Sequence, residues 1–172
     1  MLSSNLIYIA FLVVTVAIPV AYAQKADDDS YPPPPRTISK EEKARLVAET
    51  DVKRRTKLAL EFMEARMKQA EALHSLPDFD AMFVELGAFH ALVDDTLEFL
   101  TGSSTDSDKV LNNLKRFEIG VRGFVPRLEL IRRDLPFRYE FYVRRLAIFL
   151  RDAREKAIEP LFSDTVVPTK KP

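Results

Sequence analysis

The side chains best suited to metal chemistry lie in one stretch, GAFHALVDDTLEFL, at residues 87–100. His90, Asp94 and Glu98 follow one another at intervals of four residues, which would align them along one face of a helix. Imidazole and carboxylate groups are ligands for divalent metal ions, so these three residues are weak candidates for a mononuclear site. Because His90 also falls on the apolar stripe of that helix, we favour a buried histidine that is hydrogen-bonded to Asp94 or to a neighbouring helix. A perturbed His–Asp pair that senses pH is a further alternative.

A second metal pattern is the Glu-x-x-His motif formed by Glu71 and His74. Helical bundles that bind two iron or manganese ions use two such motifs on different helices. The other histidine, His90, has Leu86 and Gly87 at the positions where a glutamate would be needed. We therefore predict no dinuclear site and no cofactor.

Catalytic motifs are also missing from the sequence. It contains no glycine-rich phosphate loop, no G-x-S-x-G elbow and no H-E-x-x-H motif. The absence of cysteine excludes disulfides, thiol catalysis and cysteine-based metal sites. We predict that the protein is not an enzyme.

Length and charge narrow the function further. A chain of 172 residues with 47% hydrophobic content is sufficient for one domain with a substantial core. The 26 basic and 26 acidic side chains cancel, which leaves no strong positive field for nucleic acid. Nucleic acid is therefore not an expected partner.

Residues 1–23 have the pattern of a signal peptide. They contain no charged side chain, residues 6–18 form an apolar run of the usual length, and Ala-Tyr-Ala at 21–23 supplies small residues for cleavage before Gln24. We expect export to the periplasm or the cell exterior. Because the segment before the apolar run has no Lys or Arg, a retained N-terminal membrane anchor is the alternative.

The mature chain begins with a segment rich in Asp and Pro. Residues 24–38, QKADDDSYPPPPRTI, have a composition that opposes helix formation, and we predict a disordered spacer. Residues 161–172 are predicted to be a flexible tail. Between these segments, residues 39–160 carry the periodic apolar pattern of amphipathic helices.

Capping and breaking residues divide residues 39–160 into four predicted helices. Ser39 and Glu42 form a capping box, Gly102 ends the second helix, and Pro160 ends the last. The predicted helices span residues 39–76, 78–101, 105–135 and 136–160. Short loops favour antiparallel neighbours, so we predict an all-α fold: an up-down-up-down four-helix bundle with a long first helix.

Two of these helices have irregularities. The start of the first helix, residues 40–57, is mainly charged, so we expect it to extend beyond the core and to support self-association. The third helix contains Pro126, which removes the hydrogen bond to the carbonyl of Arg122. We predict a kink there, with a gap for a small apolar ligand as an alternative reading.

Acidic and basic residues are segregated along the chain. Residues 76–101 contain acids and no Lys or Arg, whereas residues 116–154 are rich in arginine. We expect the acids of the second helix to pair with arginines of the third and fourth helices. The alternative is that arginines near the last turn bind an acidic protein, an anionic glycan or a lipid headgroup; these are Arg132, Arg133, Arg138, Arg144 and Arg145.

These features favour a non-enzymatic function. We expect an exported helical-bundle interaction or structural module of the bacterial cell envelope. The alternative is a bundle that binds a small ligand or a metal ion through His90 and the kinked third helix.

Overall fold

The computed structural model describes residues 31–76, 79–103 and 107–162, and these residues form only helices and connecting segments. The prediction of an all-α fold is confirmed. The predicted signal peptide, residues 24–30 of the predicted spacer and residues 163–172 of the predicted tail lie outside the described residues. None of the described helices combines the length and the apolar character needed to cross a membrane.

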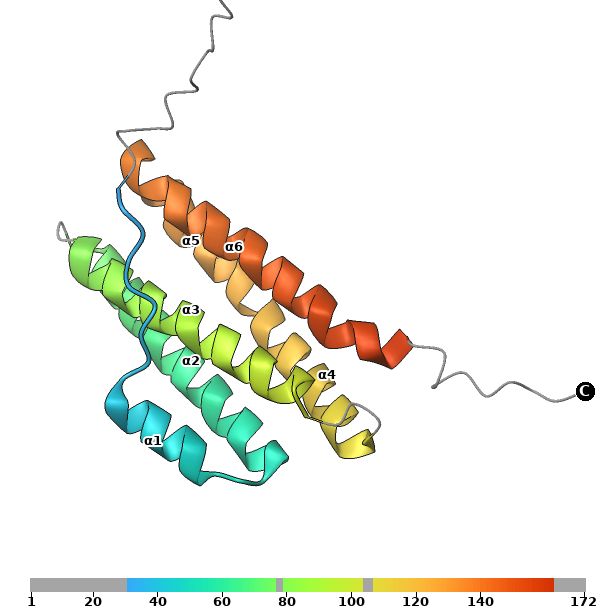
Figure 1. The fold of residues 1–172 in the computed structure, drawn as a ribbon. Coiled ribbons are helices and arrows are strands. Elements are labelled where there is room, and N and C mark those ends of the chain that lie inside the picture. Colours follow the sequence, from blue (N-terminus) through green and yellow to red (C-terminus); the bar gives the residue numbers. More distant parts are fainter. Residues whose placement is uncertain (1–30, 77–78, 104–106, 163–172) are drawn as a thin grey trace, which may run out of the picture.

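Six α-helices follow one another along the described chain, and a 3₁₀ helix ends it. Figure 1 shows α2 lying along α3, while α4 and α5 follow one line beside α6. The core takes large side chains from each of these helices, including Met63, Phe83, Phe117 and Leu146. The elements are α1 Lys40–Ala48, α2 Val52–His74, α3 Phe79–Thr101, α4 Asp108–Arg122, α5 Phe124–Asp134, α6 Phe137–Ile158 and η1 Glu159–Phe162.

The first predicted helix is two helices. The capping box at Ser39 and Glu42 begins α1, but Asp51 caps a new helix by accepting a hydrogen bond from the Arg54 amide at 3.0 Å. Helix α1 folds back beside α2 (Figure 1), and Leu46 is fully buried. The predicted extension of residues 40–57 beyond the core is therefore wrong, whereas self-association through the first helix stays a prediction. Asp51, a strong N-cap residue, was the signal for the break.

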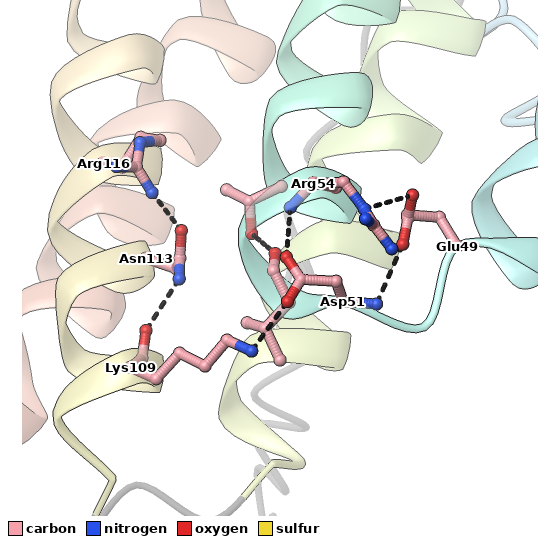
Figure 2. A network of polar contacts seen from close by, with 8 residues as sticks. Glu49, Asp51, Arg54, Lys109, Asn113 and Arg116 are labelled. Carbon is pink, nitrogen blue, oxygen red and sulfur yellow. Dashed lines mark hydrogen bonds and ion pairs between the residues drawn. The ribbon is translucent and has the colours of Figure 1, made fainter.

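The turn between α1 and α2 is fixed to the start of α4. Figure 2 shows Asp51 accepting a hydrogen bond from Lys109 at 2.7 Å, while Glu49 accepts one from the Arg54 side chain at 2.9 Å. Asn113 donates to the backbone carbonyl of Lys109 at 2.7 Å. The Lys109 hydrogen bond, followed by that of the Arg54 amide, lowers the pKa of Asp51 to about 2. Asp51 is thus both a helix cap and a link between two helices.

The third predicted helix is interrupted near Pro126. Helix α4 ends at Arg122 and α5 begins at Phe124, with Gly123 between them at φ −65° and ψ −22°. Pro126 has no amide hydrogen for the Arg122 carbonyl, which explains the break one turn before the proline. A Cβ on Gly120 would come within 2.6 Å of the Leu60 side chain, so α2 packs closely against α4 near the interruption. This close packing does not favour the alternative of a ligand gap.

The end of the described chain also differs from expectation. Leu161 and Phe162 belong to the 3₁₀ helix, although residues 161–172 were predicted to be a flexible tail. Pro160 lies within that short helix, so α6 ends just before the predicted boundary.

Candidate functional site

Residues 31–38, which we call the strap, are held against the helices. The strap passes over α3 and reaches the start of α6 (Figure 1), where the Tyr31 amide donates to the Arg138 carbonyl at 2.9 Å. The Tyr31 ring packs against Phe83 and Tyr139, with ring centroids 5.0 and 4.9 Å away, and Pro34 is buried. The prediction of disorder is wrong for these residues, because a tyrosine among the prolines supplies apolar surface that α3 and α6 cover.

Gly87 on α3 makes the close approach of the strap sterically feasible. A Cβ at this position would lie 2.4 Å from the Pro35 carbonyl oxygen and 3.3 Å from the Pro34 Cβ. The first contact is with backbone, which cannot rotate away as a side-chain end can. A larger residue at position 87 would therefore push the strap off α3.

A pocket of about 640 Å³ lies between the strap, α3 and α6. This volume is within the range of small-molecule pockets, roughly 300–1,000 Å³. The strap contributes Tyr31, Pro33 and Arg36, and α3 contributes His90. Most of the remaining lining comes from α6: Phe141, Tyr142, Arg145, Ile148, Phe149 and Asp152. The walls are thus mainly apolar and aromatic, with a few polar groups among them.

His90 forms part of the pocket wall and is 3% exposed. Its Nδ1 lies 3.3 Å from the Tyr142 hydroxyl, and its ring centroid lies 4.1 Å from that of Phe149. Its Nε2 is buried without a hydrogen-bond partner in the described part of the chain and is 3.9 Å from an Asp94 oxygen. Burial, followed by the charge of Arg36, lowers the pKa of His90 to about 4, so the imidazole is neutral at pH 7.

The Tyr142 hydroxyl lies between His90 and the backbone of α3. It is 3.4 Å from the Leu86 carbonyl oxygen, which can only accept a hydrogen bond, and 3.3 Å from Nδ1 of His90. The tautomer of the imidazole sets the direction of the hydrogen bond between this hydroxyl and Nδ1. Burial also raises the pKa of Tyr142 and of Asp94. The His90 imidazole is therefore uncharged at pH 7, and one of its two nitrogens has no hydrogen bond within the described residues.

The candidate metal ligands do not assemble into a site. Asp94 forms an ion pair with Arg36 at 3.7 Å, and the Glu71 carboxylate receives two hydrogen bonds from Arg127 at 2.6 and 2.7 Å. Across the described part of the chain, no three His, Cys, Asp or Glu side chains lie together in a way that could hold a metal ion. His90, Asp94 and Glu98 thus share a helix without forming a ligand set.

Most of the predicted partner-binding arginines have partners within the chain. Arg132 binds Glu129 at 2.7 Å and also Glu140. Arg144 lies 3.5 Å from Glu140, Arg133 lies 3.2 Å from Asp134, and Arg138 stacks over the Tyr139 ring at 5.0 Å. Arg138 and Arg145 pair with no carboxylate of the described residues, and of these two Arg145 lines the pocket, 5.9 Å from the Phe141 ring centroid.

The expected pairing between acids of α3 and arginines of α4–α6 is wrong. Within the described residues, the ion pairs of α3 go to the strap, α1 and α2, because these elements cover its charged face. They are Asp94–Arg36, Asp95–Lys43, Asp95–Arg55 and Glu85–Arg66. The arginines of α4–α6 bind glutamates of α2 or glutamates within α4–α6, among them Arg127–Glu64, Arg127–Glu71 and Arg154–Glu118.

Sequence reasoning identified His90 but missed the strap residues and the aromatic side chains of α6 as parts of one pocket. The signal available in the sequence was Tyr31 beside the prolines, together with Gly87 on an otherwise apolar helix. Comparison with protein-family models, with curated proteins and with solved structures found no match to this chain.

Proposed function

We propose that the protein is a non-enzymatic, exported binding module of the cell envelope that holds a small molecule between the strap and α6. In this proposal α2, α3, α4 with α5, and α6 are the four rods of an up-down-up-down bundle. The packing of α2 on α3 and of α4 and α5 on α6 supports this arrangement. The bundle provides a rigid floor, and the strap completes the pocket.

The pocket at His90 is the observation that carries this proposal. A pocket of about 640 Å³ with mainly apolar and aromatic walls and a few polar groups is typical of a small-molecule site, and its lining includes His90, whose buried Nε2 has no hydrogen-bond partner among the described residues. The arginines near the last turn support partner binding less well, because Arg132, Arg133 and Arg144 already pair with carboxylates of the chain.

The protonation properties of the pocket favour binding over catalysis. A general base works best when its pKa lies near the working pH, and the pKa of His90 is lowered to about 4. The Tyr142 hydroxyl beside it has a raised pKa, so it is a poor proton donor and a poor nucleophile at neutral pH. Neither group is prepared for proton transfer.

A neutral apolar dye, N-phenyl-1-naphthylamine, tests the proposal by fluorescence titration. Ile148 lines the pocket and Ile119 lies on α4, and both are exposed isoleucines on helices, so Ile148→Trp and Ile119→Trp form a matched pair. We expect saturable binding at one site per chain for the wild type and for Ile119→Trp. Ile148→Trp should weaken binding at least about tenfold, because the indole occupies the pocket.

Two results would contradict the proposed function. One is the absence of a saturable signal with the wild type. The other is an equal effect of the two substitutions, since this would place the dye outside the pocket. Circular dichroism of all three proteins checks that the helices are intact.

A further inference from the structure

We infer that the pocket selects soluble organic anions with a flat apolar body, and that Arg145 recognises their negative group. This inference rests on the proposed function, because it specifies the ligand class of the same pocket. It follows from the shape of the apolar walls and from the balance of charge among the lining residues.

The apolar walls are built for a flat molecule. Phe141, Tyr142 and Phe149 line the pocket from α6, and Tyr31 and Pro33 line it from the strap. Aromatic rings prefer offset or tilted contacts with other rings, and such contacts add to the gain from area burial. The pocket volume of about 640 Å³ accommodates a two-ring aromatic body.

The charged lining residues favour an anion over a cation. The pocket lining includes two guanidinium groups, of Arg36 and Arg145, and one carboxylate, of Asp152, while the His90 imidazole is neutral. Arg36 is already partly engaged by Asp94 at 3.7 Å. A ligand carboxylate or sulfonate therefore finds its strongest unused partner in Arg145, whose planar fork can bind two oxygens together.

Arg145 differs from Arg144 and Arg151 of α6 in having no carboxylate partner among the described residues; its contact is with the Phe141 ring at 5.9 Å. Arg144 pairs with Glu140 at 3.5 Å and Arg151 pairs with Glu129 at 3.1 Å, whereas no carboxylate in the described ranges pairs with Arg145. Arg144 is next to Arg145 in sequence but does not line the pocket. The two residues therefore provide a matched test: the same change in charge, made inside and outside the proposed site.

The experiment compares three probes of the same shape by isothermal titration calorimetry: 2-naphthoate, 2-naphthamide and 2-naphthylmethylammonium. We expect the wild type to bind the anion about fivefold more tightly than the neutral amide, because an exposed ion pair contributes modestly. The cation should bind more weakly than the amide. The preference for the anion should disappear in Arg145→Gln and persist in Arg144→Gln.

The outcomes separate this inference from the proposed function. Equal binding of the anion and the amide, stronger binding of the cation, or equal loss in both glutamine variants would overturn the role of Arg145 while leaving the pocket in place. If none of the three probes binds the wild type, the proposed function fails together with the inference. An Ile148→Trp variant measured with the same probes confirms that any binding occurs in the pocket.

Discussion

Two buried polar side chains, Glu118 and His90, differ in how completely they are hydrogen-bonded. Glu118 is 4% exposed and His90 is 3% exposed. One Glu118 oxygen accepts hydrogen bonds from Arg122 and Arg154, both at 2.9 Å, and the other accepts one from Arg122 at 2.7 Å. Among the described residues the His90 side chain has one hydrogen bond, at 3.3 Å with Tyr142, and its Nε2 has none.

The effect of burial on the pKa differs accordingly between the two side chains. Burial acts to raise the pKa of Glu118, but the hydrogen bonds from Arg122 and Arg154 outweigh it, and the pKa is lowered. Burial lowers the pKa of His90 without compensation from a carboxylate close enough to hydrogen-bond. Glu118 therefore joins α4 to α6 as part of a closed interface, whereas His90 keeps one ring nitrogen without a hydrogen bond among the described residues.

The largest expected effect tests whether α1 belongs to the closed part of the molecule. Arg66 holds Glu42 of α1 at 2.8 Å and Glu85 of α3 at 2.9 Å, and Leu46 beside this cluster is fully buried. Leu46→Ala should lower the free energy of unfolding by about 3 kcal/mol, measured by urea denaturation. Val47→Ala is the control: Val47 is 59% exposed, so its effect should stay within about 0.5 kcal/mol. Similar small effects of both changes would show that α1 does not pack on α2.

As the pH falls, protonation of His90 in the pocket should lower the stability of the fold before the ion-paired glutamates Glu42 and Glu118 are protonated. The pKa of His90 is about 4 in the folded protein against an ordinary value of 6.5. The unfolded chain therefore binds more protons between these values, and stability should fall as pH drops from 6.5 to 4, by up to about 3 kcal/mol. The lowered pKa values of Glu42 and Glu118 place their losses below pH 4.5, and the raised pKa of Asp94 acts in the opposite direction to His90.

Urea unfolding at several pH values measures this dependence. His90→Phe removes the titrating group and should flatten the profile between pH 6.5 and 4. An unchanged profile in this variant would assign the acid sensitivity to other residues.

Removal of the Glu118 carboxylate should open the closed interface. Glu118→Ala leaves two arginines without their shared partner and should cost about 2 kcal/mol of unfolding free energy. Glu155→Ala on α6 removes an exposed carboxylate and should change stability by less than about 0.5 kcal/mol. A loss no greater than that of Glu155→Ala would mean that the Glu118 cluster is not structural.

The smallest expected effect has the opposite sign. His90→Phe removes the unpartnered Nε2 from the interior and keeps a ring of similar shape, so it should raise stability at pH 7 by up to about 1 kcal/mol. Tyr142→Phe, in contrast, removes the partner of Nδ1 and should lower stability by about 1 kcal/mol. If His90→Phe is strongly destabilising, His90 is a packing residue and the contrast with Glu118 does not hold.

The sequence predicted the helical parts of this structure well because helices are specified locally. The capping box at Ser39, the end of α3 near Gly102 and the interruption before Pro126 each depend on a few neighbouring residues. The break at Asp51 is also local, because an N-cap aspartate interrupts the helix that is predicted over residues 39–76.

The pocket could not be predicted in the same way. Its strap wall depends on Tyr31 meeting Phe83 and Tyr139, which are distant in sequence, and on Gly87 leaving room for Pro35. A segment without regular secondary structure carries no periodic pattern to indicate which helix it will cover. The charge pairing failed for a related reason, because the folding back of α1 brings Lys43 to Asp95.

The position of the strap determines where a group joined to the N-terminal side of the described chain would lie relative to the pocket. Tyr31 is bound near the start of α6, beside the pocket, whereas α6 ends at the opposite end of the molecule (Figure 1). A surface, carrier domain or affinity tag joined before residue 31 would therefore lie close to the pocket entrance. The same addition after η1 would lie at the end of α6 away from Tyr31 and the strap, so fusions for binding studies belong at the C-terminal side.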